Sequence, residues 1–209
     1  MGILFDAASN SGYNSALSSI SWSHTTSGSE RLLIVTVSML SVAASSVSSI
    51  TYNSVNLTKL RHDVSVSGTI RTEIWYLGAP TTGSNTVVVT LSVALDSIAG
   101  AMSFSGVNQI SPVDAQNGTT GVGTTATVAV TTVNDNAVVV DVVSTSDTAI
   151  TVGAGQTQRH NITGTLGSGA SSTEGPHSPA GSTTMSWSNI GADDSWTISV
   201  MSINSAAYI

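Results

Sequence analysis

The most constraining feature of the sequence is the stretch Ile70–Leu91, which has the pattern of strand, turn, strand. The break Gly78–Asn85 contains Pro80 and two glycines, which is the chemistry of turns. The β-branched run Val87–Val89 that follows suits a pleated sheet. Before the break, alternate residues fall on two faces, with Ile70, Thr72, Ile74 and Tyr76 on one and Arg71, Glu73, Trp75 and Leu77 on the other. We therefore predict a β-hairpin here and a sheet at the centre of the fold.

The strongest single strand is Arg31–Ser41, whose first half is apolar on both faces and which we place in the middle of a sheet. We expect a second hairpin from Thr125–Thr132 and Ala137–Thr145, with Asn134–Asn136 in its turn. Two strands, Ser49–Asn53 and Asn56–Asp63, are predicted around a tight turn at Asn53–Ser54. Further strands are predicted at Ile3–Ala7, Ser19–His24, Ser97–Gly106, Gln156–Ile162, Thr183–Trp187 and Ser195–Ile203. Loops are expected at Ser9–Ser15 and Val42–Ser49, and long loops at 107–125 and 164–181.

Short strands at a spacing of about 8–12 residues, with no convincing amphipathic helix, are typical of a sandwich or barrel. We therefore expect an all-β protein in which residues 1–209 form one antiparallel β-sandwich domain. A jelly roll is the first choice, and an immunoglobulin-like sandwich is the alternative. No strict repeat is seen at the roughly 20–50-residue periods of solenoids and propellers.

Charge excludes several classes of partner. Only 8% of the residues are charged, the net charge is −7, and five residues are basic. Without a basic patch, binding to nucleic acid or to an anionic membrane is not expected. No apolar run approaches the roughly 20 residues of a membrane span. The start MGILFDAAS lacks the basic region of a signal peptide, so we expect a protein made and assembled in the cytoplasm, or one whose signal has been removed.

No catalytic or metal-binding pattern stands out. The histidines lie in separate segments without zinc-ligand spacing, and there is no G-x-S-x-G elbow. Two of the carboxylates could act as the catalytic pair of a glycosidase, but no sequence pattern identifies such a pair. Loops 134–136 and 192–194 could bind calcium, with ordinary Asx turns as the alternative. We predict that the protein is not an enzyme, that it binds no cofactor, and that it has no catalytic, cofactor-binding or metal-binding residues. The side chains considered for such roles are His24, His62, His160, His177, Glu30, Glu73, Glu174, Asp96, Asp114, Asp141, Asp147, Asp193 and Asp194.

Four tryptophans lie on predicted strands: Trp22, Trp75, Trp187 and Trp196. If exposed together, they would form a platform on which sugars stack. The chain has few other large side chains, because only 5% of its residues are aromatic. Packing in the core is therefore the favoured interpretation.

The order of several motifs resembles a β-sandwich module of bacterial surface and secreted proteins and of tailed-phage virion proteins. The matching segments cover nearly the whole chain: SISWSHTTSGSERLLIVTVSM, SSITYNSVNLTKL, EIWYLGAPTTGSNTVVVTLS, GAMSFSGVNQISPVDA, GQTQRHNI, TTMSWS and DSWTISVMSI. The resemblance implies a structural or adhesive role and brings no catalytic residues with it.

From these observations we expect a non-enzymatic structural protein, namely a phage virion decoration or tail-associated protein that forms homo-oligomers. Its expected partners are other copies of itself and a major capsid or tail protein, and its expected location is the virion. The alternative is an extracellular carbohydrate-binding or adhesive module whose partners are glycans. The long loops at 107–125 and 164–181 are the natural places for contacts, because a rigid sheet positions its loops.

Overall fold

The computed structural model describes residues 2–40, 45–147 and 149–206, and within them every regular element is a β-strand. The first half of the chain contains β1 (Leu4–Thr26), β2 (Leu32–Leu40), β3 (Val47–Tyr52), β4 (Val55–Asn56), β5 (Thr58–Val64), β6 (Ile70–Gly78) and β7 (Gly83–Ser105). The second half contains β8 (Val113–Val122), β9 (Thr125–Thr131), β10 (Ala137–Thr145), β11 (Thr151–Val152), β12 (Thr157–Gly164), β13 (Gly167–His177), β14 (Ser182–Ser188) and β15 (Ser195–Ile203). All pairings are antiparallel.

In the first half, the long strands β1 and β7 each belong to two layers. They pair along their whole length, but the register shifts several times between Asn10 and Ser19, where both strands bend. On one side of the bend, Ser19–Thr26 of β1 pairs with Gly83–Leu91 of β7, and β7 also pairs with β3. On the other side, the first part of β1 and the last part of β7 belong to a sheet with the order β5-β6-β2-β7-β1. The first half of the chain thus forms two layers, which we call its inner sheet (β5-β6-β2-β7-β1) and its outer sheet (β3, β4 and the paired parts of β1 and β7).

The second half repeats this arrangement with shorter strands. Its inner sheet has the order β12-β13-β10-β15-β8 and its outer sheet the order β11-β14-β9. The pair β8 and β9 takes the place of β1, and the pair β14 and β15 takes the place of β7. Strands β10, β11, β12 and β13 correspond to β2, β3, β5 and β6. The chain is therefore a structural repeat of two similar halves, with a period far longer than those considered from the sequence.

Local details repeat as well as topology. The turn into β2 has Glu30 at φ 52°, and the turn into β10 has Asn136 at φ 61°. At the end of β1, the buried Thr26 donates a hydrogen bond of 2.6 Å from its hydroxyl to the carbonyl of Thr81. At the equivalent position after β9, the buried Thr132 donates one of 3.2 Å to the carbonyl of Gly181. The same side-chain chemistry therefore fixes the same turn in both halves.

One aspartate caps this turn in each half. Asp6 accepts hydrogen bonds from the Ser27 amide at 2.8 Å, from the Ser27 hydroxyl, and from the Ser103 hydroxyl at 2.7 Å. Asp114 accepts from the Val133 amide at 2.9 Å and from the Ser202 hydroxyl at 2.9 Å. Burial opposes ionisation of Asp6, but these donors outweigh it and lower the pKa of its carboxyl.

We expect Asp6→Ala and Asp114→Ala each to lower the free energy of unfolding by about 1–3 kcal/mol, because each leaves several donors without their acceptor. Urea unfolding followed by tryptophan fluorescence measures the loss. The exposed Asp193 provides the control, and Asp193→Ala should shift the midpoint very little. If Asp6→Ala and Asp114→Ala behaved like this control, the capping role would be refuted.

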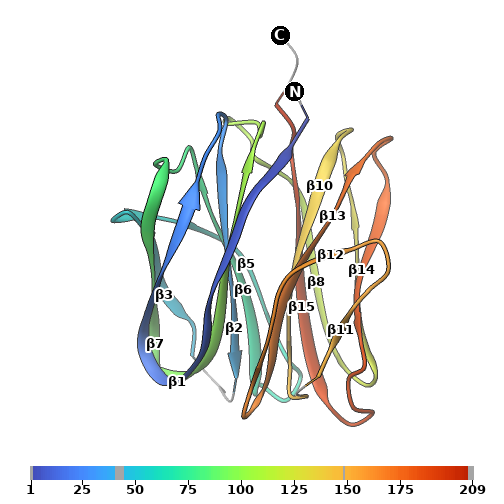
Figure 1. Ribbon diagram of the computed structural model, residues 1–209. Coiled ribbons are helices and arrows are strands. Elements are labelled where there is room, and N and C mark those ends of the chain that lie inside the picture. The colour runs from blue at the N-terminus through green and yellow to red at the C-terminus, as the bar shows by residue number, and fades with distance from the viewer. Residues whose placement is uncertain (1, 41–44, 148, 207–209) are drawn as a thin grey trace.

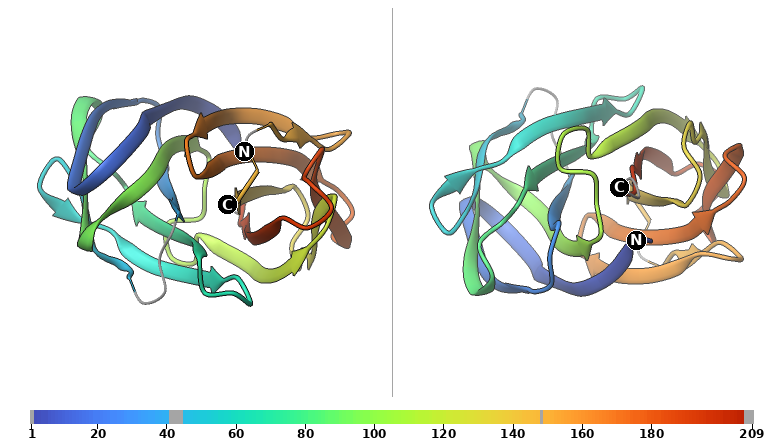
Figure 2. Two further views of the ribbon diagram at one scale, coloured as in Figure 1. Left: turned by 90° about the horizontal axis from the view of Figure 1, so that it is seen from below. Right: turned by 90° about the horizontal axis from the view of Figure 1, so that it is seen from above.

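The two inner sheets pack face to face, so the layers run outer, inner, inner, outer (Figure 1). Viewed along the strands, the two halves appear as two lobes side by side (Figure 2). Each lobe has its own core, and a third apolar layer fills the space between the inner sheets. That shared layer is made by Ile3, Leu32, Ile34, Ile74, Met102, Phe104, Val107, Val138, Val140, Val142, Met201 and Ile203.

The structure confirms an all-β, antiparallel sandwich of the jelly-roll type. It also confirms the central place of β2, which is buried along its length between β6 and β7. That residues 1–209 form one domain stays a prediction, and the apolar layer shared by the two halves favours it. The loop expected at Val42–Ser49 lies partly outside the described residues, and its last three residues belong to β3 instead.

The hairpins predicted at Ile70–Leu91 and at 125–145 are wrong, whereas the tight turn predicted at Asn53–Ser54 is confirmed, with Tyr52 opposite Val55. Strands β6 and β7 do not pair, because β2 lies between them. Strands β9 and β10 do not pair either: β9 pairs with β14, and β10 pairs with β13 and β15. In each case the short turn connects the inner sheet with the outer sheet instead of two neighbours in one sheet. A turn-rich sequence fits both connections equally well.

The segments predicted as loops are largely strand. Residues 107–125 contain β8, residues 164–181 contain β13, and Ser9–Ser15 lies within β1. The glycine and serine content of β13 has a packing reason. A Cβ atom on Gly169 would lie 2.7 Å from the Cβ of Ser38, so only a very small residue lets the two inner sheets approach this closely.

Candidate functional site

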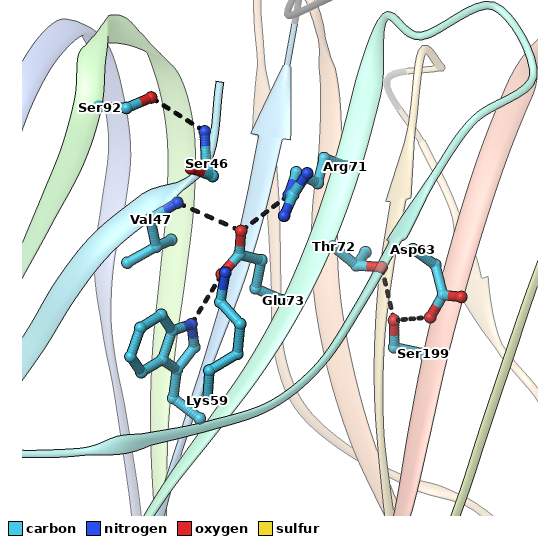
Figure 3. Close-up of polar contacts among 10 residues, drawn as sticks. Ser46, Val47, Lys59, Asp63, Arg71, Thr72, Glu73, Ser92 and Ser199 are labelled. Carbon is cyan, nitrogen blue, oxygen red and sulfur yellow. Dashed lines mark hydrogen bonds and ion pairs between the residues drawn. The ribbon is translucent and has the colours of Figure 1, made fainter. Parts of the chain in front are cut away.

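The densest charged cluster of the described residues surrounds Glu73 on β6 (Figure 3). Its side chain is fully buried and faces the core of the first half. One oxygen accepts from Arg71 Nε at 2.7 Å and from the Val47 amide at 3.2 Å. The other accepts from Trp75 Nε1 at 2.9 Å and lies 2.9 Å from Lys59 Nζ. Strand alternation places Arg71, Glu73 and Trp75 on one face, and the register of β5 on β6 brings Lys59 opposite Trp75.

The arrangement suits cross-linking of strands better than catalysis. Each oxygen of Glu73 already has two donors, which come from β3, β5 and β6. Lys59 is the most open member, with 32% of its side chain exposed, and its ammonium lies 5.1 Å from the centroid of the Trp75 ring. The cluster therefore ties the edge strand β5 and the start of β3 to the centre of the sheet.

A second buried carboxylate, Asp141 on β10, lies in the core of the other half. It accepts from the Ser172 amide at 2.6 Å, the Ser172 hydroxyl at 2.9 Å and Trp187 Nε1 at 2.8 Å, with Gln156 Nε2 at 3.3 Å. None of these donors carries a charge. Burial therefore dominates and raises the pKa of Asp141 to about 7, although the bonds from Trp187 and Ser172 oppose the rise.

Polar contacts also cross the layer between the halves. Asp63 on β5 forms a two-pronged pair with Arg61, with both N–O distances at 2.7 Å. Asp63 also accepts from the Ser199 hydroxyl of β15 at 2.6 Å, and Ser199 lies 2.7 Å from the Thr72 hydroxyl (Figure 3). Facing Asp63 is Gly118, where a Cβ atom would lie 2.0 Å from the carboxylate. The contact thus depends on glycine at that position.

The four histidines stay apart. His24 is buried, and its Nδ1 lies 2.8 Å from the Ser9 hydroxyl. His160 is buried at the layer between the halves. Burial lowers the pKa of each to about 4, so both imidazoles are neutral at pH 7. His62 is exposed on β5, and His177 lies at the end of β13, 3.9 Å from Glu174.

His160 and Gly100 provide a test of how closely the halves fit. A Cβ atom on Gly100 would lie 2.2 Å from Cε1 of His160. We expect Gly100→Ala to lower the free energy of unfolding by about 1–3 kcal/mol through overpacking. Gly78→Ala is the control, because a Cβ atom there meets nothing within 4 Å. In a double-mutant cycle read by urea unfolding, His160→Ala should relieve part of the Gly100→Ala cost. Additive losses would contradict direct contact.

The remaining carboxylates hold turns and loops. Asp96 accepts from the Tyr13 hydroxyl at 2.7 Å, Asp135 from the Ala180 amide at 2.7 Å and Asp194 from the Ser146 hydroxyl at 2.8 Å. Asp147 accepts from the Gly191 amide at 2.6 Å. In residues 2–40, 45–147 and 149–206, no group of three or more His, Cys, Asp or Glu side chains could hold a metal ion. The same residues contain no helix long and apolar enough to cross a membrane.

The tryptophans do not form a platform. Trp75, Trp187 and Trp196 are buried in the two lobe cores. Trp22 is half-buried against the first core, and its Nε1 donates to the Ser9 hydroxyl at 3.0 Å. Core packing, which the sequence favoured, is what the structure shows for these side chains.

The feature that sequence reasoning missed is the separation of charge between inner and outer sheets. We call the outer N sheet β3, β4, Ser19–Thr26 and Gly83–Leu91, and the outer C sheet β9, β11 and β14. No residue of these strands is Asp, Glu, Lys or Arg. The charged residues lie on the inner sheets, at the bend of β7 and in loops. The alternation of Ser or Thr with apolar residues in SISWSHTT and TATVAVT was the available signal.

The solvent faces of the outer sheets carry rows of hydroxyls. On the outer N sheet the rows are Ser19–Thr90–Ser49, Ser21–Val88–Thr51 and Ser23–Thr86. On the outer C sheet they are Thr125–Ser188–Thr151, Thr127–Ser186, Ala129–Thr184 and Thr131–Ser182. Of these side chains, those on β1, β9 and most of β14 are exposed. The two outer sheets lie on opposite sides of the molecule (Figures 1 and 2).

No protein-family model and no curated protein matches the sequence. Solved structures are only weakly similar. The ANXUR2 extracellular domain from Arabidopsis thaliana is 5% identical, with 98% of this chain and 90% of that chain covered and a TM-score of 0.30. The STIV MCP is 8% identical, with 97% and 96% covered and a TM-score of 0.29. A chain of Sulfolobus Turreted Icosahedral Virus is 12% identical, with 96% and 61% covered and a TM-score of 0.31. Scores this low carry no argument about fold or function.

Proposed function

We propose that the chain is a non-enzymatic structural protein that binds the surface of a larger assembly, as a virion decoration or tail-associated protein does. The observation that supports this proposal is the pair of charge-free hydroxyl faces on opposite sides of the molecule. The buried carboxylates, by contrast, are engaged in contacts between strands.

The physical reason is the cost of removing water. Burying a charged side chain in an interface is expensive unless it meets a partner of opposite charge. A hydroxyl is cheaper to desolvate and can both donate and accept a hydrogen bond. A sheet face lined with hydroxyls therefore suits contact with another protein surface. The glycan-binding alternative has no aromatic platform in the described residues, so we rank it second.

The proposal is tested by locating the protein. Antibodies raised against the chain, followed by gold labelling, are applied to particles purified from the source culture. We expect gold on the particle surface, and none with pre-immune serum. Recovery of the chain only in the particle-free fraction would overturn the proposal. Binding to a glycan panel in that case would favour the adhesive alternative.

A further inference from the structure

We propose that the outer N sheet and the outer C sheet are contact faces for further copies of this chain, so that the protein associates through both faces into an open array. This inference rests on the proposed function and names one partner within it. It is carried by the distribution of charge, the self-complementary chemistry of the two faces and their opposite placement.

The distribution of charge decides where copies can meet. With a net charge of −7, two molecules repel each other over most approaches. The outer sheets contribute nothing to that repulsion, because their strands hold no charged residue and their one histidine, His24, points into the core. They are therefore the two sheet surfaces on which a second copy meets no like charge.

The chemistry of the faces favours an identical partner. A charged patch needs a partner patch of opposite sign, but a row of hydroxyls matches another row of hydroxyls, since each group donates and accepts. The two faces are also alike: Ser19, Ser21 and Thr25 are matched by Thr125, Thr127 and Thr131 at the equivalent positions of the repeat. The match is incomplete, since Ser23 corresponds to Ala129 and Val88 to Ser186, but either face presents a similar uncharged surface to a neighbouring molecule.

The placement of the faces determines the kind of assembly. The outer sheets lie at opposite ends of the layer order, separated by both inner sheets (Figure 1). A molecule with one such face would stop at a closed dimer. A molecule with two opposed faces can bind a neighbour on each side, so association continues beyond the dimer. With one neighbour on each of two opposed faces, the expected product is an open linear chain of copies.

The experiment is sedimentation of the full chain across a range from micromolar to millimolar concentration. Ser21→Glu with Thr86→Glu charges the outer N sheet, and Thr127→Glu with Thr184→Glu charges the outer C sheet. A matched control, Thr58→Glu with Thr157→Glu, places the same charges on exposed positions of the inner-sheet edges. Circular dichroism and urea midpoints confirm that every variant is folded.

We expect the mean mass of the wild type to rise beyond that of a dimer with concentration, and the control to do the same. A variant with one charged face should go no further than a dimer. Charging both faces should raise the concentration needed for association by about tenfold or more. A wild type that stays monomeric, or association that survives charging of both faces, would overturn the inference. Gold-labelled particles together with a monomeric wild type would refute self-association alone and leave the proposed function standing.

Discussion

Replacing Glu73 with alanine is expected to lower the free energy of unfolding by about 3–5 kcal/mol, because the change breaks a buried ion pair from one side. Arg71, whose side chain is only 14% exposed, would keep its charge without a partner. The amide of Val47 and Nε1 of Trp75 would lose their acceptor as well. The removed side chain also leaves a cavity in the first lobe.

Two related variants separate the contributions to this loss. Lys59→Ala removes the most exposed member of the cluster and should cost about 1 kcal/mol or less. Glu73→Gln keeps the shape but replaces one acceptor with a donor that faces other donors, so its cost should lie between the two. Chemical denaturation of all three proteins in one buffer gives the order. Equal losses from Lys59→Ala and Glu73→Ala would contradict the view that Glu73 is the centre of the cluster.

The second large effect is a pH dependence in which two kinds of buried group act against each other. The pKa of Asp141 is about 7, against an ordinary 3.8, so the folded state keeps a proton that the unfolded state releases. This contribution lowers stability as pH rises through that range. The pKa of His24 and of His160 is about 4, against 6.5, so the unfolded state binds their protons first. Their contribution raises stability over nearly the same range, and the lowered pKa of the more exposed His62 adds in the same direction.

Each group contributes a slope of up to about 1.4 kcal/mol per pH unit. With two histidines against one aspartate, the wild type should gain about 1.4 kcal/mol per unit between roughly pH 4.5 and 6. Asp141→Asn removes the opposing contribution, so the slope should about double. His160→Gln leaves His24 against Asp141, with the contribution of the more exposed His62 added to that of His24, so the slope should fall to a small positive value. Urea midpoints at several pH values measure this, and an Asp141→Asn profile parallel to that of the wild type would contradict the assignment.

Much of the local structure can be predicted from the sequence. The alternation from Ile70 to Leu77 predicts the two faces of β6, and the doubly apolar run after Arg31 predicts the buried central strand β2. The predictions fail where small residues fill buried positions. In β13 the run from Gly167 to Thr173 is buried although it contains only glycine, alanine, serine and threonine. Propensity treats such a run as a loop, whereas packing against the other inner sheet makes it a strand.

The uncharged faces of the outer N and outer C sheets could be predicted from the sequence only in part. The scarcity of charge and the alternating Ser and Thr are visible in the letters. Their gathering on two outer sheets depends on which strands pair, and in particular on the bend that moves β1 and β7 from the inner layer to the outer one. The structural repeat was hidden for a related reason, since pairing, turn conformation and capping repeat while few side chains do.

What the sequence alone determined is the class of structure: β-strands in alternating patterns, a core of small aliphatic side chains and an uncharged polar surface. The reason is that strand patterning is a local property with a period of two residues. Only the tertiary structure decided which strands are neighbours, that two similar halves share a buried layer, and that Glu73 and Asp141 lie inside the lobes. Those outcomes depend on contacts between residues far apart in the chain. The sequence of a short turn does not indicate whether the turn joins two strands of one sheet or two different layers.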